Sequence, residues 1–289
     1  MIFKVYMKLI LFVVFVFFSF LCTAKEQMTW YAYNQPPAYI FEGKFKNQGF
    51  INLTQEILIK TLTQYHHNTE QVTVGRFLHQ LRLKENACVL GLYKTPEREK
   101  YILYSDNALM HRGLHVLISK KKAQHFKLTS PLDLAELLQK HNLSTIVIQG
   151  RSYGNMLDNI LNKNLENVLS RSSQSNSQLY KMLALNRFDF LIDYPSTAAY
   201  AFKSKLLKSD DYVLLKINGI PSYIESSVGC SKTEWGYRAI SAINIALKKE
   251  KNTKAYLDAL LSWSSNLSDR EDFIKFYYQE FLFPQSPKN

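Results

Sequence analysis

The segment 150–154, Gly-Arg-Ser-Tyr-Gly, has the pattern G-x-S-x-G, in which a sharp turn between a strand and a helix exposes a serine as a nucleophile. The apolar residues 144–149 predict the strand that this context needs. In hydrolases of this type an acid and then a histidine follow the serine along the chain. All seven histidines, the last of them His141, precede Ser152. This order argues strongly against a serine hydrolase.

The same turn has a second possible use, which needs no catalysis. Backbone N–H groups at the start of a helix, together with the Ser152 hydroxyl, form a site for an anion. Arg151 stands in the same turn and would add a positive charge. The alternative is that Ser152 only caps the helix. Both interpretations stay open, and Arg151 and Ser152 are candidate ligand-binding residues.

Other patterns with chemical potential point away from metals and cofactors. The adjacent pair His66-His67 is interpreted as a solvated cap at the end of a helix. The chain has no H-E-x-x-H, C-x-x-C or carboxylate cluster with metal spacing, and no G-x-G-x-x-G or Walker loop. We therefore expect no metal and no cofactor. The basic run Lys120-Lys121-Lys122 is interpreted as a solvated loop, and no nucleic-acid partner is expected.

Composition defines the broad class. The 289 residues are 46% hydrophobic and 21% charged, with a net charge of +12. These values exclude a wholly disordered or collagen-like chain. Ten glycines and eight prolines argue against a repeat or linker-rich architecture. The length allows one large domain or two lobes.

The first 24 residues have the pattern of a cleavable signal peptide. Lys4 and Lys8 precede the apolar core 9–21, and Cys22-Thr23-Ala24 places small residues before a cut at Lys25. The core is too short for a membrane span, and Ser19-Phe20-Leu21 does not make a lipobox. The alternative is a retained anchor helix. We expect an unlipidated, exported protein, retained in the periplasm of a bacterium with two membranes.

The mature chain alternates strands and helices, which is typical of an α/β fold with mostly parallel sheets. Predicted strands include 27–33, 115–119, 188–194 and 212–217, and predicted helices include one that begins at Asn52 and three after Thr233. No Pro/Ser-rich linker separates two sequential domains. This absence favours a discontinuous arrangement, in which the chain leaves one lobe and later returns to it.

The order of features resembles the third family of bacterial extracellular solute-binding proteins, the amino-acid type of periplasmic receptor. The resemblance spans nearly the whole mature chain. Its motifs are Pro36-Pro37, Gly49-Phe50, Thr95-Pro96-Glu97-Arg98, Tyr104-Ser105, the turn at Gly150, Asn186-Arg187-Phe188-Asp189 and Gly229-Cys230-Ser231-Lys232.

The resemblance implies a two-lobed class II periplasmic-binding-protein fold with two hinge crossings. Lobe one would comprise residues 25–110 and 223–289, and lobe two residues 111–222. A ligand would bind in the cleft, and the hinge would close around it.

The resemblance also assigns ligand contacts. Arg98 matches the arginine that binds a ligand carboxylate through paired hydrogen bonds, and Thr95 would donate to the same anion. The alternative for Arg98 is an ion pair with Glu97, Glu99 or another surface acid. In lobe two, Asp193 or Tyr194 matches the position that holds a ligand ammonium. Of the aromatic residues near the first strand, Tyr33 is a candidate, although core packing is the usual role. The expected ligand is a small carboxylate-bearing solute, anionic or zwitterionic.

Three functions compete. The first is a monomeric, non-catalytic protein that delivers the solute to a membrane transporter. The second is a sensor that presents its closed form to a membrane receptor. The third is a dehydratase-type enzyme, for which Glu97 and Asp193 are the available acid–base groups. Binding without catalysis is the preferred interpretation.

A disulfide between Cys88 and Cys230 follows from the export argument. After cleavage before Lys25 these are the two cysteines left in the chain, and an exported protein meets an oxidising compartment. If their strands are neighbours, the bridge would join the first and returning segments of lobe one. The alternative is a pair of buried thiols.

Overall fold

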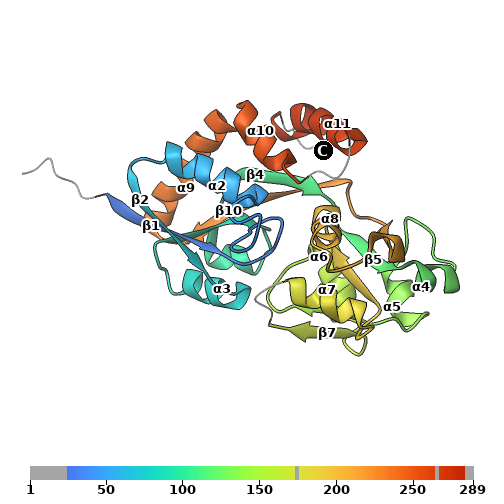
Figure 1. Cartoon of the computed structure of the whole chain (residues 1–289). Helices are drawn as coiled ribbons and strands as arrows, with labels where there is room; N and C mark the ends of the chain where they lie inside the picture. Colours follow the sequence, from blue (N-terminus) through green and yellow to red (C-terminus); the bar gives the residue numbers. More distant parts are fainter. Residues whose placement is uncertain (1–24, 173–175, 264–266, 284–289) are drawn as a thin grey trace, which may run out of the picture.

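The computed structural model describes residues 25–172, 176–263 and 267–283. The expected signal peptide, residues 1–24, lies outside this part of the chain. The described residues form two lobes side by side, and the first and last elements lie in the same lobe (Figure 1). Among these residues no helix is both long and apolar enough to cross a membrane.

Lobe one is built on a five-stranded sheet in the order β2-β1-β3-β10-β4. Its strands are β1 (Glu26–Ala32), β2 (Tyr65–Gln71), β3 (Ala87–Leu92), β4 (Ile102–Arg112) and β10 (Tyr223–Ser231). Strand β1 is parallel to β2 and β3, whereas β10 is antiparallel to β3 and β4. The returning strand β10 is therefore inserted into a sheet whose other strands come from the start of the chain.

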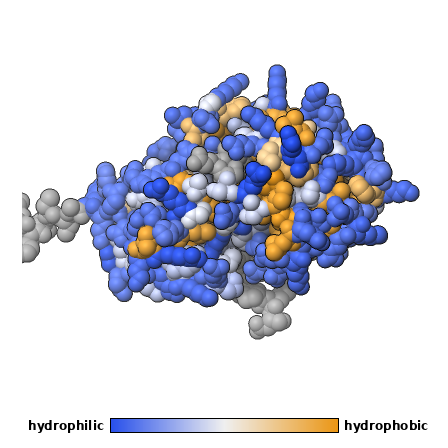
Figure 2. Space-filling model, turned by 90° about the horizontal axis from the view of Figure 1, so that it is seen from below, coloured by the Kyte–Doolittle hydropathy of each residue, from blue (hydrophilic) through white to orange (hydrophobic). Residues whose placement is uncertain are grey.

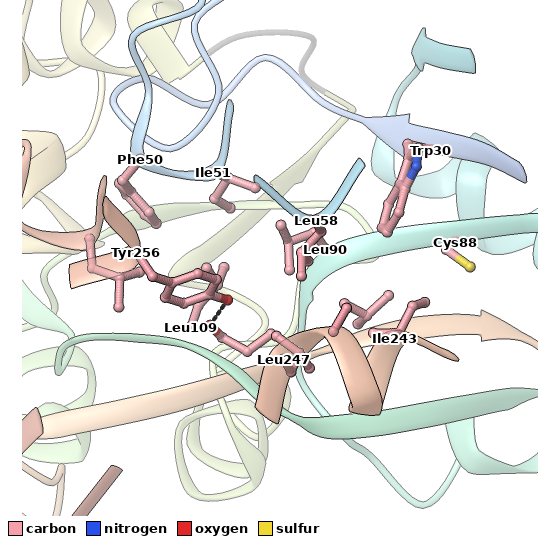
Figure 3. Close-up of a cluster of buried hydrophobic side chains, with 14 of the residues drawn as sticks. Trp30, Phe50, Ile51, Leu58, Cys88, Leu90, Leu109, Ile243, Leu247 and Tyr256 are labelled. Carbon is pink, nitrogen blue, oxygen red and sulfur yellow. Dashed lines mark hydrogen bonds between the residues drawn. The ribbon is translucent and has the colours of Figure 1, made fainter. Parts of the chain in front are cut away.

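Helices cover both faces of this sheet (Figure 1). They are α2 (Phe50–Thr61), α3 (Val74–Arg82), α9 (Glu234–Glu250), α10 (Lys254–Leu261), α11 (Leu267–Phe276) and the π-helical turn η3 (Tyr277–Phe281). Figure 3 shows the core between α2, α9, α10 and the sheet, where Leu58, Leu90 and Ile243 are fully buried. The Tyr256 hydroxyl donates to the carbonyl of Ala108 at 2.6 Å within this core, so its polar atom is satisfied.

Cys88 and Cys230 form a disulfide with an S–S distance of 2.05 Å. The two residues lie directly opposite each other on β3 and β10. The bridge therefore joins the first and returning segments of lobe one, and the predicted pairing is confirmed. Its Cα–Cα distance of 4.1 Å is shorter than the roughly 4.4–6.8 Å that is usual for a disulfide, because the bridge connects directly paired strand residues.

Lobe two has its own sheet, in the order β7-β6-β8-β5-β9. Its strands are β5 (His115–Ser119), β6 (Thr145–Ile148), β7 (Val168–Arg171), β8 (Phe190–Asp193) and β9 (Tyr212–Lys216). The surrounding helices are α4 (Lys120–His125), α5 (Leu134–Gln139), α6 (Asn155–Asn162), α7 (Asn176–Ala184), α8 (Pro195–Lys203) and the short 3₁₀ turn η2 (Ser209–Asp211).

The chain passes between the sheets twice, from β4 to β5 and from β9 to β10. The two passages touch, because Gly113 N donates to Ser222 O at 2.9 Å. A Cβ atom at Gly113 would lie 2.1 Å from Pro221 O, so a residue without a side chain is needed there. The predicted two-lobed α/β fold with two crossings is confirmed. The sheets are mixed rather than mostly parallel, since β10 and β5 are antiparallel to their neighbours.

Three local predictions are wrong. His66 and His67 lie in β2, which pairs along its full length with β1, so tertiary pairing overrides a weak local signal. His67 Nδ1 accepts from Trp30 Nε1 at 3.0 Å. Helix α2 begins at Phe50, because Asn52 accepts from Gly49 N at 3.2 Å instead of capping a later start.

The third concerns the basic run 120–122, which opens helix α4 rather than forming a loop. The ammonium group of Lys122 lies 2.5 Å from Asp189, so this lysine has a structural partner. The face of the molecule seen in Figure 2 is largely hydrophilic, with separate hydrophobic patches.

Candidate functional site

A cavity of about 700 Å³ lies between the two lobes. The wall from lobe one consists of α3 and the segment 95–98, where the 3₁₀ turn η1 (Arg98–Lys100) begins. The wall from lobe two consists of residues 149–153 and α6. The segments 95–98 and 149–153 follow the carboxyl ends of β3 and β6, the edge at which open α/β sheets bind ligands.

Arg98 is the buried cation at this junction, with 7% of its surface exposed. Its Nη1 donates to Tyr93 O at 3.1 Å, within lobe one. Its Nη2 donates to Gly150 O at 2.8 Å, across to lobe two. Within the described part of the chain it makes no ion pair with a carboxylate, so the expected alternative with Glu97 or Glu99 does not occur. Further N–H donors of the guanidinium stay available.

The neighbouring Thr95 shapes the loop that presents Arg98. Its hydroxyl accepts from Arg98 N at 3.3 Å, and its carbonyl accepts from Glu99 N at 3.0 Å. Thr95 and Arg98 both line the cavity. The sequence pattern 95–98 thus forms one compact turn on the wall of lobe one.

Arg151 is a second buried arginine, from the opposite wall. Its Nη2 lies 3.3 Å from Asp193 Oδ1, and both side chains are buried. Its guanidinium lies 4.6 Å from the centre of the Tyr153 ring and 5.3 Å from that of Tyr194. An acid and two aromatic faces therefore hold this cation in one orientation.

Asp193 accepts three hydrogen bonds from the protein. Its Oδ1 accepts from Tyr194 N at 2.9 Å in addition to Arg151. Its Oδ2 accepts from the Tyr180 hydroxyl at 2.7 Å. Asp193 ends β8, and it lies behind Arg151 rather than on the cavity wall.

Ser152 supports the start of α6. Its hydroxyl donates to Asp158 Oδ2 at 2.5 Å and accepts from Gly154 N at 3.2 Å. Asp158 Oδ1 accepts from Tyr153 N at 2.8 Å. The anion at this turn is therefore the carboxylate of Asp158, and the serine hydroxyl donates to that acid, with no histidine in the base position.

An aromatic cluster joins the lobes beside the arginines. The hydroxyl groups of Tyr93 and Tyr194 lie 2.6 Å apart, and the rings of His111 and Tyr194 have centres 4.5 Å apart. Burial raises the pKa of Tyr33 to about 12, against the opposing charges of Arg151 and Arg98. Burial also lowers the pKa of His111 to about 4. Both groups are uncharged at pH 7.

The predicted residues thus divide into two groups. Thr95, Arg98, Arg151 and Ser152 line the cavity, whereas Tyr33, Asp193 and Tyr194 lie beside it. Tyr93, Tyr153 and Asp158 were not predicted. Tyr93 directly follows β3. Because ligands bind at the carboxyl ends of strands in open α/β sheets, this position in the sequence could have identified Tyr93 as a candidate. Among the described residues no group of three or more metal-ligating side chains occurs.

Comparison with known proteins gives matches in structure alone. No protein-family model matches the sequence, and no curated protein matches it. One solved structure, from work on glutathione import by Streptococcus mutans via GshT and the cystine ABC importer TcyBC, covers 86% of this chain and 100% of its own, with a TM-score of 0.64 and 16% identity. The chain has the fold of two-lobed substrate-binding proteins.

Two further structures extend this comparison. An ancestral arginine-binding protein bound to arginine matches with a TM-score of 0.63 at 15% identity, covering 84% of this chain and 99% of its own. A histidine kinase sensor domain with similarity to periplasmic binding proteins matches with a TM-score of 0.63 at 10% identity, covering 83% and 96%. The same fold therefore occurs in both transport and sensing proteins.

Proposed function

We propose that this protein captures a small carboxylate-bearing solute between its two lobes and delivers it to a membrane transporter. In this proposal lobe one comprises residues 25–110 and 223–289, and lobe two residues 111–222. The protein acts as a monomer in the periplasm, after removal of residues 1–24. The disulfide between Cys88 and Cys230 supports an oxidising compartment.

The observation that carries this proposal is the state of Arg98. A buried guanidinium is costly unless an anion or several hydrogen bonds compensate its charge. Arg98 has two backbone carbonyls as partners, one from each lobe, and it lines the cavity. A carboxylate entering the cavity would supply the missing charge through paired hydrogen bonds. Arg98 also contacts Gly150 of lobe two. A ligand bound to Arg98 would therefore lie where the two lobes meet and would favour the closed form.

Sensing is the second candidate, and one specific observation favours it. A histidine kinase sensor domain has this fold and matches about as well as the transport proteins. Both functions would use the same cavity and the same closed form. A gene for a permease or for a receptor beside the gene of this protein would distinguish them.

The enzyme interpretation has weaker support. A dehydratase needs an acid–base group at the substrate. Glu97 lies 2.7 Å from Arg82 and its side chain is 72% exposed, while Asp193 is paired with Arg151 behind the cavity wall. The environments of both acids favour structural ion pairs over proton transfer, which supports binding without catalysis.

A thermal-shift screen tests the proposal, because a ligand that binds the folded state raises the apparent stability. The library contains amino acids, mono- and dicarboxylates, short peptides and polyamines. Each hit is measured again with Arg98→Ala and with Arg82→Ala, a control on the same wall whose charge is already paired. We expect carboxylate hits that vanish in Arg98→Ala and persist in Arg82→Ala. No carboxylate hit, or hits indifferent to Arg98, would contradict the proposal.

A further inference from the structure

The acid of the inter-lobe cluster leaves little capacity for a ligand. Asp193 accepts hydrogen bonds from Arg151, from Tyr194 N and from the Tyr180 hydroxyl. Its side chain is 5% exposed, and its charge is balanced by Arg151 at 3.3 Å. A ligand ammonium group that took over the charge of this carboxylate would displace Arg151. Such displacement would leave a buried guanidinium without its acid, which is unfavourable.

Arg151 lines the cavity, whereas that acid does not. The stacking of its guanidinium near Tyr153 and Tyr194 and its pairing with Asp193 hold the group in one orientation. Among the described residues, Asp193 is the one acid within ion-pair distance of it. The planar group has more N–H donors than this one contact uses, so donors stay available for an anion.

Two arginines from opposite lobes therefore meet at one cavity. Arg98 Nη2 donates to the carbonyl of Gly150, the residue directly before Arg151. Among the other charges on the wall, Arg82 pairs with Glu97. The carboxylate of Asp158 accepts from the Ser152 hydroxyl and from Tyr153 N at the start of α6. His79 is the remaining ionisable group of the lining. Arg98 is thus the one cation of the lining that has no carboxylate partner among the described residues.

We propose that the ligand is a small dicarboxylate without an ammonium group, bound through Arg98 in lobe one and Arg151 in lobe two. Asp193 is a positioning residue, which orients Arg151 and does not touch the ligand. An ammonium group beside the ligand carboxylate would face two guanidinium groups, and the acid next to Arg151, Asp193, is already paired. The repulsion from the two arginines provides specificity. This inference rests on the proposed function and names its ligand class.

Matched pairs of probes test the ligand class by calorimetry: succinate with aspartate, and glutarate with glutamate. The members of each pair differ in one ammonium group. We expect the diacid to bind at least 10-fold more tightly than its amino acid. Equal or tighter binding of the amino acid would overturn the inference and leave the proposed function standing. The inference would also be overturned, and the proposed function would stand, if none of the four probes binds but another carboxylate of the library does. Failure of every carboxylate would overturn both.

Variants test the roles of the two residues. We expect Arg151→Gln to weaken glutarate binding at least 30-fold and to bring the glutarate-to-glutamate affinity ratio close to one. Arg151→Lys keeps the charge without the planar fork and should fall between Arg151→Gln and the natural protein. The single variant Arg151→Gln leaves Asp193 as an unpaired buried charge. The double variant Arg151→Gln/Asp193→Asn removes both charges and avoids this destabilisation. Circular dichroism checks that the double variant folds.

Asp193→Asn separates positioning from ligand contact. If Asp193 orients Arg151, this variant binds glutarate more weakly than the natural protein does. It should also bind glutamate no more tightly than glutarate. If Asp193 bound an ammonium group, glutamate affinity alone would fall and glutarate affinity would not change. This second pattern would overturn the inference, and so would a double variant that retains the natural preference for glutarate.

Discussion

The hydroxyl groups of Tyr93 and Tyr194 lie 2.6 Å apart and form a side-chain hydrogen bond between the lobes. Tyr93 follows β3 of lobe one, and Tyr194 follows β8 of lobe two. His111, near the first crossing, contacts both: its Nε2 lies 3.4 Å from the Tyr93 hydroxyl, and its ring packs against that of Tyr194. This contact forms where the lobes close, so it contributes to the free-energy difference between the open and closed forms.

Removing one of these hydroxyls should therefore weaken ligand binding without removing a ligand contact. A neutral hydrogen bond contributes about 0.5–1.5 kcal/mol, which corresponds to an apparent affinity about 5-fold lower in Tyr93→Phe. Calorimetry with the tightest hit of the screen measures the change. Tyr237→Phe, at a tyrosine with 56% exposure in α9, is the control. Unchanged affinity in Tyr93→Phe would show that the tyrosine pair does not contribute to closure.

A second contact between the lobes lies at Trp263. Lys203 of α8 lies 5.1 Å from the centre of the Trp263 ring and 4.8 Å from that of Phe45. The rings of Tyr200 and Trp263 have centres 5.5 Å apart. Helix α8 belongs to lobe two, and Phe45 and Trp263 belong to lobe one. Opening of the lobes would separate these groups and change the surroundings of the indole.

Tryptophan fluorescence should consequently report closure through one residue. Trp30 and Trp235 are buried in the core of lobe one, so their surroundings do not change when the lobes move. We expect a ligand-dependent fluorescence change that disappears in Trp263→Phe while the thermal shift persists. The same change in Trp263→Phe as in the natural protein would rule out this assignment.

Lys203→Ala tests the energetic contribution of this second contact. Cation–π interactions contribute about 0.5–1 kcal/mol at exposed sites, so the apparent affinity should fall by about 2- to 5-fold. The matched control is Lys208→Ala, at an exposed lysine of the same lobe. An equal loss in both variants would indicate a general effect of surface charge instead.

The fold was predictable because its signals are strong and local. Apolar strands such as 115–119 and the cysteine pair were recognisable without the structure, and the alternation of strands and helices indicated the class. Strand β2 was missed because its residues, including His66 and His67, are polar, and its pairing with β1 exists only in the folded chain. Such tertiary pairing leaves no periodic pattern in the segment itself.

The candidate site was only partly predictable, for a related reason. The turn 95–98 and the turn at Gly150 are compact motifs, and Arg98, Thr95, Arg151 and Ser152 reach the cavity as expected. The partners of Asp193 and Ser152 depend on which side chains the fold brings near them. Tyr180 lies on α7 and Asp158 on α6, and nothing in their spacing indicated that they would complete these hydrogen bonds.

The disulfide should contribute to the stability of lobe one. It closes a loop with a sequence separation of 142 residues, for which the loop-entropy model predicts up to about 4–5 kcal/mol. We expect urea unfolding of the natural protein to shift to lower urea when a reductant is present, and no shift with reductant in the double variant Cys88→Ala/Cys230→Ala. Free alkylation of both cysteines in the unfolded, unreduced protein would contradict the bridge.

His111 should make the protein less stable at acid pH. Burial lowers its pKa from 6.5 to about 4, so the unfolded chain takes up the proton first as the pH falls. The stabilisation is present above pH 6.5 and is lost progressively down to pH 4. A pKa difference of this size corresponds to about 3 kcal/mol of folding stability, lost by the time the pH has fallen to 4. The groups around the ring, Phe50, Tyr93, Tyr194 and the cation of Arg151, offer no acid to stabilise its charged form.

Urea unfolding at pH 7, 5.5 and 4.5 checks this expectation against the variant His111→Asn, which cannot take up the proton. The variant should start less stable at pH 7, because it loses the contacts with Tyr93 and Tyr194, and it should lose less stability than the natural protein on acidification. His125→Asn, at an exposed histidine of α4, should follow the natural protein at every pH. Parallel pH profiles for the natural protein and His111→Asn would show that another group carries the acid sensitivity.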